Sequence, residues 1–382
     1  MIKRQFWLKK IENAWRKKSI IWLAGVRRCG KTSLCRSLGA AEYFDCELPR
    51  TRQRMEDPES FLQEHEGKSI ILDEIHRLSN PSELLKIASD HYPNIKIIAT
   101  GSSSLGASAK FKDTLTGRKE NIWLTPMNRE DLVDFKHSSL PQRLFKGGLP
   151  PFFLATVPMD KEYQNWVDDF WSKDIQELFR IERRYSFIKF FELLMAQSGG
   201  IFEASKFTAP CEISRQTVSN YLGVLEATFI AHILRPYHTH LPTEITAAPK
   251  VYAFDTGFIS YYRGWGQHRE DDLGVLWEHF VLNEIHAQGW GKDIHYWRDK
   301  RGHEIDFVMS SPQGLRAVEC KWKTKNLEAK NFLALWERYP NAKGYVVAAD
   351  VKKGFTHKVR QHSIRVVSLA EFIEETAQTI HR

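Results

Sequence analysis

Residues 20–32, IIWLAGVRRCGKT, join an apolar run to a glycine-rich loop of the pattern GxxxxGK[ST]. The five apolar residues predict a buried strand, and the segment TSLCRSL that follows predicts the first turns of a helix. Gly25 and Gly30 let the backbone curl so that successive N–H groups point at phosphate oxygens, and the helix adds the positive end of its dipole. Strand, loop and helix in this order predict a nucleoside triphosphate site.

The loop residues and a second motif, which is acidic, define the expected chemistry of this site. Lys31 is expected to reach the β- and γ-phosphates, and the Thr32 hydroxyl to bind Mg²⁺. Residues 69–74, SIILDE, end an apolar run in two carboxylates, 42 residues after Lys31. We expect Asp73 to hold Mg²⁺ and Glu74 to polarise the attacking water as general base, which predicts ATP or GTP hydrolysis. The residues expected to bind the nucleotide are Gly25, Cys29, Gly30, Lys31, Thr32, Ser33 and Asp73.

Polar residues after the next apolar run are candidate sensors. In IKIIATGSSSL, Thr100 or Ser102 is placed to touch the γ-phosphate or the water, although a serine-rich loop capping the next helix explains them equally well. Arg118, in TLTGRKENIWL, is a candidate arginine finger for a neighbouring subunit's nucleotide, and the alternative is a surface arginine. Arg143 lies in the region of a second sensor, but no motif supports that role.

A different set of charged residues lies in the last third of the chain. Asp306 falls in a strand-like run, and Glu319 and Lys321 form an E-x-K pattern in the next one. Period-two alternation places Glu319 and Lys321 on one face of their strand. This pattern resembles the core of the PD-(D/E)XK nucleases, and Glu278 corresponds to the acidic residue on the first helix of that fold.

The nuclease pattern implies a metal site. Asp306, Glu319 and the Cys320 carbonyl would offer hard oxygen ligands to Mg²⁺ or Mn²⁺, with Glu278 as a further ligand. Lys321 would orient the water or steady the phosphorane charge. The alternative is a surface hairpin that carries a salt bridge. Basic and aromatic residues that would bind a phosphate backbone or stack on bases flank the pattern, and half of them are equally explained as solvated or core residues: Trp297, Arg298, Lys300, Arg301, Trp322, Lys323 and Lys325.

The middle of the chain has the sequence pattern of a winged helix. Residues 201–209 suit a first helix, Ser214 is a good N-cap for a second, and residues 230–236 suit a wing strand. As a DNA reader the second helix would present Arg215, Gln216 and Ser219 to a major groove. A packing and dimerising scaffold is the alternative, because Arg215 is the one basic residue on the expected exposed face.

Length and composition bound the class of protein. The 382 residues suggest two or three domains, and the net charge of +8 with a pI of about 9.1 makes nucleic acid a plausible partner. Five cysteines without a CxxC pair indicate neither a disulfide framework nor a zinc site, which fits a reducing cytosol. The basic start has no apolar signal region, and no apolar run approaches the length of a membrane span. We therefore expect a cytoplasmic protein without membrane segments.

The pattern of apolar runs divides the chain into three regions. An α/β domain with a parallel sheet is expected over residues 1–150, a helical and winged-helix-like region over 151–245, and an α/β nuclease-like domain over 246–382. Residues 236–249 are the expected linker or irregular loop. The expected strands are residues 20–24, 41–45, 69–72, 95–99, 121–124, 304–309, 317–321, 344–348 and 363–367, and the expected long helices are 163–179 and 187–197.

The motifs taken together carry a family resemblance. GVRRCGKT, ILDEI, ATGSSSL, LTGR and GGLPPF, in this order and spacing, resemble bacterial and archaeal AAA+ ATPases with a C-terminal domain of unknown function and a nuclease-like end. The resemblance runs over nearly the whole chain. It implies that Lys31 and Thr32 bind nucleotide, that Asp73 and Glu74 are the Walker B pair, and that Arg118 is a finger acting in trans in a homo-oligomer. Related ATPases also carry a winged helix in the middle region.

The first functional hypothesis is an ATP-driven, Mg²⁺-dependent enzyme that acts on DNA, including branched or stalled structures, in repair, recombination or defence. The second is a nucleotide-switched binding or scaffold protein whose nuclease fold only docks a partner. The complete set Glu278, Asp306, Glu319 and Lys321 favours the first hypothesis, because a pure scaffold need not keep it.

Overall fold

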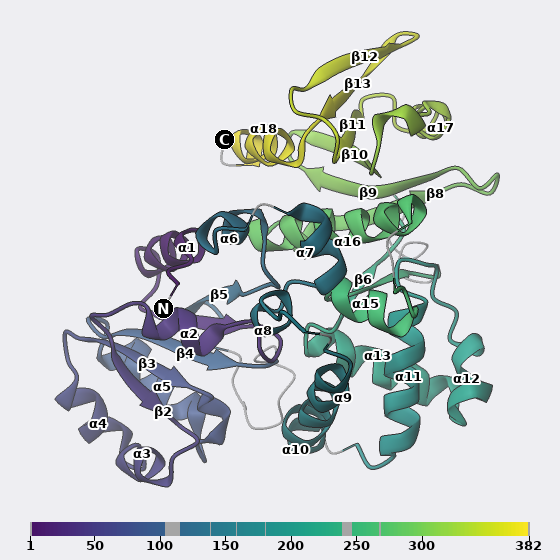
Figure 1. Ribbon diagram of the computed structural model, residues 1–382. Coiled ribbons are helices and arrows are strands. Elements are labelled where there is room, and N and C mark those ends of the chain that lie inside the picture. The colour runs from purple at the N-terminus through teal and green to yellow at the C-terminus, as the bar shows by residue number, and fades with distance from the viewer. Residues whose placement is uncertain are drawn as a thin grey trace. The chain divides into compact units, whose positions relative to one another are not determined.

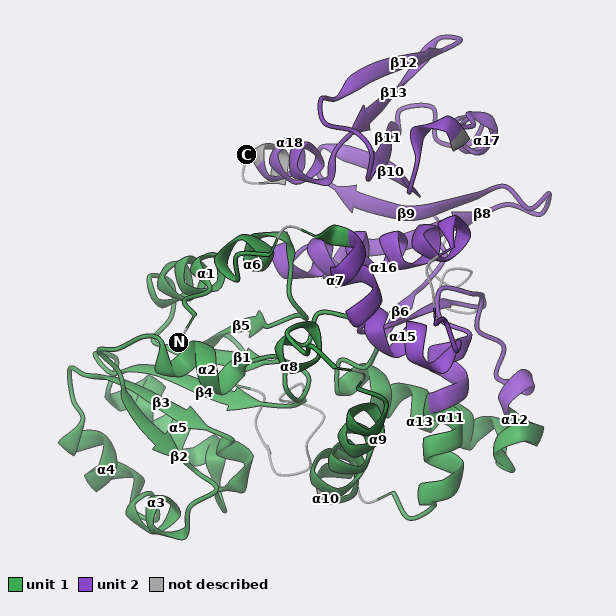
Figure 2. Ribbon diagram, viewed as in Figure 1, with its two compact units in different colours: residues 1–140, 147–191, 208–231 green, residues 141–146, 192–207, 232–382 purple. Residues whose placement is uncertain are grey.

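The computed structural model describes residues 2–103, 115–137, 139–157, 159–179, 181–238, 247–266 and 269–380. The chain divides into two compact units that interleave along the sequence (Figure 2). Unit 1 comprises residues 1–140, 147–191 and 208–231, and unit 2 comprises residues 141–146, 192–207 and 232–382. No helix among the described residues has the length and hydropathy needed to cross a bilayer.

Unit 1 is built on a five-stranded sheet in the order β2-β3-β4-β1-β5 (Figure 1). All four strand pairs are parallel, so the carboxyl ends of the strands share one edge. Each expected strand of this region is confirmed, with shifts of one or two residues at the ends. The strands are β1 (Ile20–Ala24), β2 (Glu42–Asp45), β3 (Ser69–Asp73), β4 (Lys96–Gly101) and β5 (Lys119–Trp123).

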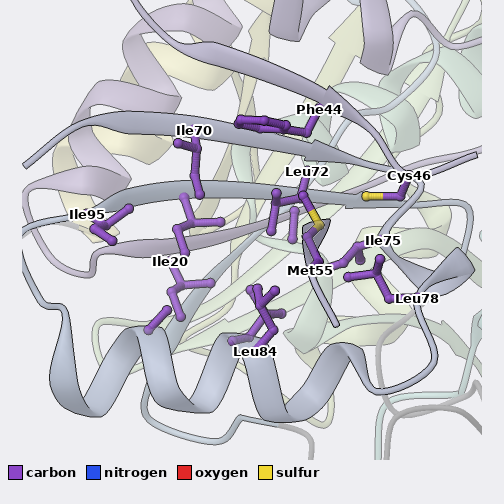
Figure 3. Close-up of a cluster of buried hydrophobic side chains, with 14 of the residues drawn as sticks. Ile20, Phe44, Cys46, Met55, Ile70, Leu72, Ile75, Leu78, Leu84 and Ile95 are labelled. Atoms are coloured by element: carbon purple, nitrogen blue, oxygen red, sulfur yellow. The ribbon is translucent and has the colours of Figure 1, made fainter. Parts of the chain in front are cut away.

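Both faces of this sheet are covered, as a buried parallel sheet requires. All five residues of β1 are buried, so its apolar run does not alternate. Figure 3 shows one core layer, in which Ile20 and Leu72 face the helix that carries Leu84. The helices of this unit are α1 (Gln5–Trp15), α2 (Lys31–Arg36), α3 (Pro49–Arg54), α4 (Pro58–Glu64), α5 (Pro81–His91), α6 (Arg129–Asp134), α8 (Pro150–Phe153), α9 (Asp160–Asp169), α10 (Gln176–Phe179) and α13 (Arg215–Ala227), with a 3-10 turn η1 (Ile75–Arg77).

The predicted helix 163–179 is not one regular α-helix. A π-helical segment, η3 (Phe170–Ile175), separates α9 from α10. Segments of this kind often occur at functional sites. The predicted helix 187–197 is α11 (Arg184–Ala196), and α12 (Ser205–Cys211) begins four residues later than the first helix of the predicted winged helix.

Unit 2 contains a mixed six-stranded sheet in the order β12-β13-β11-β10-β9-β8. The strands β8, β9 and β10 are antiparallel, β10, β11 and β13 are parallel, and β12 returns antiparallel to β13. The four predicted strands are confirmed, whereas β8 and β12 were not predicted. The strands are β8 (Ile294–Arg298), β9 (Glu304–Ser311), β10 (Gly314–Lys321), β11 (Lys343–Ala348), β12 (Phe355–Val359) and β13 (His362–Val367).

Helices flank this sheet, and a small second sheet accompanies it. The predicted wing strand exists as β6 (Ala231–Leu234), but it pairs with β7 (Lys250–Ala253) rather than closing a local hairpin. Residues 239–246 of the expected linker lie outside the described residues. The helices are α7 (Leu140–Lys146), α15 (Thr256–Tyr262), α16 (Glu270–Gln288), α17 (Lys330–Trp336) and α18 (Leu369–Ile380), with 3-10 turns η4 (Gly291–Asp293) and η5 (Thr324–Asn326).

Candidate functional sites

The phosphate-binding loop connects β1 to α2, as the sequence predicts. A Cβ atom at Gly25 would lie 2.5 Å from the Leu124 carbonyl oxygen, so the loop can pass β5 only with glycine there. Gly30 has a φ of +99°, a conformation that favours glycine. The buried Cys29 accepts a 2.9 Å hydrogen bond on its carbonyl from Arg4 Nη1, which fixes the loop to the N-terminal segment.

The two Walker motifs meet at the carboxyl edge of the sheet. Thr32 Oγ1 donates a 2.7 Å hydrogen bond to Asp73 Oδ2, and the Tyr43 hydroxyl donates to the same oxygen at 2.5 Å. Lys31 Nζ donates to the loop carbonyls of Gly25 at 2.8 Å and Val26 at 3.3 Å. The cation therefore lies inside the curl of the loop, where phosphate oxygens bind in sites of this kind. Tyr43 was missed by sequence reasoning, because a lone tyrosine on a strand carries no motif.

Glu74 and Thr100 continue this network. Thr100 Oγ1 donates to Asp73 Oδ1 at 2.5 Å and accepts from the Glu74 backbone N–H at 2.9 Å. Glu74 has a φ of +52°, which turns the chain sharply after β3. Burial raises the pKa of the Glu74 carboxyl, with Asp73 adding to the rise and Lys31 opposing it. A carboxyl with a raised pKa suits the predicted general base, since proton transfer is most efficient near the working pH.

A hollow of about 310 Å³ lies against the loop. The predicted residues Gly30, Lys31, Thr32, Ser33, Glu74 and Ser102 line it together with four that were not predicted: Arg27, Arg28, Pro150 and Pro151. The two arginines occupy the variable positions of the loop pattern, and the prolines belong to the GGLPPF segment. The arginines and the prolines were both visible in the sequence, but the phosphate-binding motif requires neither residue type at these positions.

The loop arginines pair with the segment that contains the π-helix. Arg27 Nε lies 2.9 Å from Asp174 Oδ2, and Asp174 is 1% exposed. Burial acts to lower the pKa of Arg27, but the Asp174 carboxylate outweighs it, so the pKa is raised. Arg28 contacts Glu162 at 3.0 Å and Asp169 at 3.1 Å. The phosphate-binding loop is thus held by carboxylates about 140 residues away in sequence.

The candidate finger Arg118 lies at the amino ends of the strands, whereas the phosphate-binding loop lies at their carboxyl ends. It precedes β5, whose first residue pairs with Ile20 at the start of β1, whereas the loop follows the end of β1. Its guanidinium contacts Asp90 through Nε at 2.8 Å and Nη2 at 3.2 Å. Arg118 therefore cannot act on the nucleotide of its own chain, and its action in trans stays a prediction. Arg143 is buried within unit 2, where it donates to Thr256 Oγ1 at 3.1 Å.

The charged set of unit 2 gathers around the first residues of β9 and the end of β10. Asp306 Oδ2 accepts a 2.8 Å hydrogen bond from the Cys320 backbone N–H, which ties the two strands together. Glu319, 2% exposed, lies 3.0 Å from Lys321 Nζ and accepts from Asn331 Nδ2 at 2.9 Å. Burial, and next the Glu278 carboxylate, raises the pKa of Asp306 to about 7. Burial also raises the pKa of Glu319.

Two residues of β7 that the sequence did not single out belong to this cluster. The Tyr252 hydroxyl donates to Glu278 Oε1 at 2.5 Å, and Lys250 Nζ lies 3.6 Å from the same oxygen. Lys250 also contacts Glu304 Oε1 at 2.5 Å and is 5% exposed. A buried ammonium thus compensates part of the negative charge, although β7 precedes β9 by more than 50 residues.

The donor set fits a magnesium-type ion only in part. Over the described residues, no three side chains of His, Cys, Asp or Glu are grouped so as to hold a metal. Asp306 and Glu319 are hard oxygen donors on neighbouring strands, and Mg²⁺ usually takes one or two carboxylates and keeps several waters. Glu278, occupied by Tyr252 and Lys250, is less suited to be a ligand than the sequence pattern implies.

The flanking basic and aromatic residues fall into different environments. Trp297 is 2% exposed and belongs to the core, so it cannot stack on a base. Arg298 contacts Glu304 at 3.7 Å, while Lys323 and Lys325 both contact Glu270. Lys300 and Arg301 lie in the β8–β9 turn, and both are exposed. The predicted patch is therefore smaller and less positive than the sequence indicates.

The middle region contains two consecutive helices, α12 and α13, where the sequence predicts a helix-turn-helix. Ser214 caps α13, since its hydroxyl accepts from the Thr217 N–H at 3.1 Å. Arg215, Gln216 and Ser219 are exposed, whereas Tyr221 is buried against Phe187. Because these three polar residues are exposed, they are available either to contact DNA or to contact another protein surface, the two roles that the sequence allows.

Comparisons with known proteins give three family matches along the chain. Residues 17–133 match an AAA domain, residues 137–269 match a domain of unknown function (DUF8612), and residues 273–372 match another (DUF4143). Residues 17–133 are thus a P-loop domain of the AAA type, which supports ATP hydrolysis by this part of the chain.

Two relatives are similar in sequence to a large part of this chain. The chain is 26% identical over 320 residues to the uncharacterised protein Rv2008c of Mycobacterium tuberculosis, covering 81% of this chain and 71% of the relative. It is 23% identical over 270 residues to the uncharacterised protein MJ1544 of Methanocaldococcus jannaschii, covering 63% and 58%.

Two solved structures resemble the fold more distantly. The Walker-type ATPase PABY2304 of Pyrococcus abyssi is 16% identical with a TM-score of 0.44, covering 69% of this chain and 96% of that one. The RuvB Holliday junction branch migration motor of Thermotoga maritima is 15% identical with a TM-score of 0.31, covering 61% and 90%.

Proposed function

We propose that this P-loop ATPase couples nucleotide hydrolysis to Mg²⁺-dependent cleavage of DNA, including branched DNA, by its C-terminal sheet. The proposal includes ATP and Mg²⁺ as cofactors, a cytoplasmic homo-oligomer, and Arg118 acting on a neighbouring subunit. One observation carries it: Asp306, Glu319 and Lys321 lie on adjacent strands, Glu319 is buried, Asp306 is half-buried, and the pKa values of both carboxyls are raised.

The negative charge of Asp306 and Glu319, which needs compensation, supports the assignment of a metal site. Burying a carboxylate is costly unless a positive charge compensates it, and Lys250 and Lys321 supply only part of that charge. A divalent cation would complete the compensation, polarise the scissile phosphate and lower the pKa of a bound water. Lys321, held 3.0 Å from Glu319, would then steady the negative charge that develops on the phosphate.

The ATPase residues have roles of their own in the proposal. Glu74 takes the proton of the attacking water, and Thr100 fixes the orientation of Asp73 and of the Glu74 backbone. Arg27 and Arg28 connect the loop to Asp174, Glu162 and Asp169. A displacement of the loop on hydrolysis would therefore move the segment 160–179.

A nucleotide-switched scaffold is the second candidate. It is favoured by the absence, over the described residues, of a ready group of three metal-binding side chains, and by the engagement of Glu278 with Tyr252. In that case the buried carboxyls would stabilise the fold through Lys250 and Lys321 and would not react.

Cleavage assays separate the two candidates. Single-stranded, duplex and junction DNA are incubated with wild type, Asp306→Ala and Lys31→Ala in the presence of Mg²⁺ or Mn²⁺. We expect Asp306→Ala to abolish cleavage and keep ATP hydrolysis, and Lys31→Ala to lose ATP hydrolysis. The absence of cleavage of every substrate by wild type, together with identical metal titrations of wild type and Glu319→Gln, would favour the scaffold.

A further inference from the structure

A single row of paired residues crosses the C-terminal sheet from Glu319 to an exposed aromatic side chain. Glu319 pairs with Val346, Val346 with Val366, and Val366 with Phe355. Directly paired residues point to the same face of a sheet, so Phe355 lies on the face that carries Glu319. Three strand spacings of roughly 4.8 Å separate their backbones by about 14 Å.

Phe355 is unusual in being exposed. Its side chain is 47% exposed, and every other phenylalanine that the structure describes is buried or half-buried. Among the described residues no aromatic ring packs against it. It begins β12, the edge strand of the sheet (Figure 1). The first four residues of β12 are all exposed.

The backbone beside Phe355 is fixed. The N–H of Gly354 donates a 2.9 Å hydrogen bond to Glu371 Oε1, and the other oxygen of Glu371 accepts from the Ser368 N–H at 3.0 Å. A Cβ atom at Gly354 would lie 3.0 Å from Arg365 and Val367, so the chain packs closely on β13 here. The ring is therefore presented by a rigid element rather than by a loose loop.

Two lysines precede Phe355 at the same edge of the sheet. Lys352 and Lys353 are exposed and form no ion pair with any residue that the structure describes. In this they differ from Lys323 and Lys325, which both contact Glu270. Residues 351–367 contain five Lys and Arg and no Asp or Glu, in a chain whose net charge is +8.

We propose that Lys352, Lys353 and Phe355 form a docking element for an unpaired stretch of nucleic acid, with the lysines on phosphates and the ring stacked on a base. The proposal rests on the proposed function and adds the class of substrate. Lysines with an exposed aromatic ring are the combination that binds single strands without sequence preference. An acid-free segment favours a polyanion over a protein strand that would add to β12 through backbone hydrogen bonds.

The distance between Phe355 and Glu319 determines which nucleotides of such a substrate would contact each residue. A separation of about 14 Å corresponds to about four stacked nucleotides at 3.4 Å each. The nucleotide on Phe355 would thus lie about four positions from the phosphate nearest Glu319. DNA that contains both a duplex and an unpaired stretch would satisfy this arrangement.

Binding is tested without cleavage, by fluorescence anisotropy in EDTA. The probes are a labelled oligodeoxythymidine of roughly 20 nucleotides, longer than the 4–16 nucleotides of typical single-strand sites, and a duplex of the same length. Phe355→Ala is expected to weaken binding of the single strand at least about fivefold and of the duplex far less. Lys352→Ala/Lys353→Ala is expected to lower the salt-dependence slope for the single strand by about 1.4, or 0.7 per phosphate contact.

The sheet itself offers a matched control. Lys343→Ala/Lys358→Ala removes the same charge from the opposite end of the strands, because Lys343 begins β11 and Lys358 lies near the end of β12, which is antiparallel to its neighbour β13. This variant is expected to bind like wild type. Equal binding by the Phe355, Lys352/Lys353 and control variants would overturn the docking element and leave the proposed function standing.

Two other outcomes have separate meanings. If wild type binds neither probe, the proposed action on DNA fails together with the inference. If Phe355→Ala changes the oligomeric state in gel filtration and not the affinity for DNA, β12 is a protein-binding edge and the docking element is wrong. ATP hydrolysis is expected to be unchanged in all of these variants, because none of the substituted residues belongs to unit 1.

Discussion

Arg27 and Asp174 form an ion pair, 2.9 Å between Nε and Oδ2, that joins the phosphate-binding loop to the π-helical segment η3. Asp174 is almost completely buried, and its second oxygen makes no hydrogen bond with any described residue. The carboxylate therefore depends on Arg27 for compensation of its charge. The loop motif itself does not require an arginine at this position.

Arg27→Ala is expected to lower the free energy of unfolding by about 3 kcal/mol, because removal of one partner leaves an uncompensated buried charge. Arg27→Ala/Asp174→Ala should be less destabilised than the sum of the single variants, which chemical denaturation measures. The control is Arg184→Ala, whose partner Asp168 is exposed, and its expected cost is below about 1 kcal/mol. Equal costs for Arg27→Ala and Arg184→Ala would contradict the role assigned to the buried pair.

Arg118→Ala is expected to reduce the rate of ATP hydrolysis by about 10³-fold or more if Arg118 is a finger acting in trans. Asp90→Ala breaks the same surface ion pair but leaves the arginine in place, so it should retain activity. Mixing Arg118→Ala with Lys31→Ala subunits should restore part of the activity, since each mixed interface can combine an intact loop with an intact finger. Failure of this complementation, with loss of activity in Asp90→Ala as well, would argue for a structural role.

Stability is expected to fall at alkaline pH because of buried thiols in unit 1. Burial raises the pKa of Cys46 to about 12 and that of Cys35 further, and both residues are 0% exposed. Between pH 9 and pH 12 the unfolded chain loses these protons and the folded chain keeps them, so the folded state is disfavoured as the pH rises. From pH 8 to pH 10 the loss is about 1.4 kcal/mol per thiol.

Urea denaturation of wild type and Cys35→Ala/Cys46→Ala at the two pH values measures this effect. The variant should be less stable at pH 8, because it leaves cavities, yet its stability should fall by about 3 kcal/mol less between pH 8 and pH 10. Equal slopes in the two proteins would show that these thiols do not contribute.

Much of the nucleotide site could be predicted because its motifs are local. The apolar runs before Gly25 and Asp73 identify β1 and β3, and parallel pairing brings their carboxyl ends to one edge. The contacts of Arg27 with Asp174 could not be predicted, since nothing in the spacing of two residues 147 apart indicates proximity. A helix with π-helical hydrogen bonds likewise has no distinct apolar period that a sequence would reveal.

The C-terminal sheet was predictable only in its centre. The strands β9, β10, β11 and β13 contain apolar runs, whereas β12 is polar and exposed over four residues and so lacks the pattern of a packed strand. The E-x-K pattern located Glu319 and Lys321 correctly on one strand. Lys250 and Tyr252 were missed because their contact with Glu278 depends on tertiary packing alone.

The interleaving of the two units limits how the protein can be divided. The chain passes between them at residues 140/141, 146/147, 191/192, 207/208 and 231/232. Truncation at any one of these positions would leave at least one unit incomplete, as would fusion of a fragment to another protein. Recombination of this protein with other domains, in evolution or in engineering, therefore has to transfer the two units together.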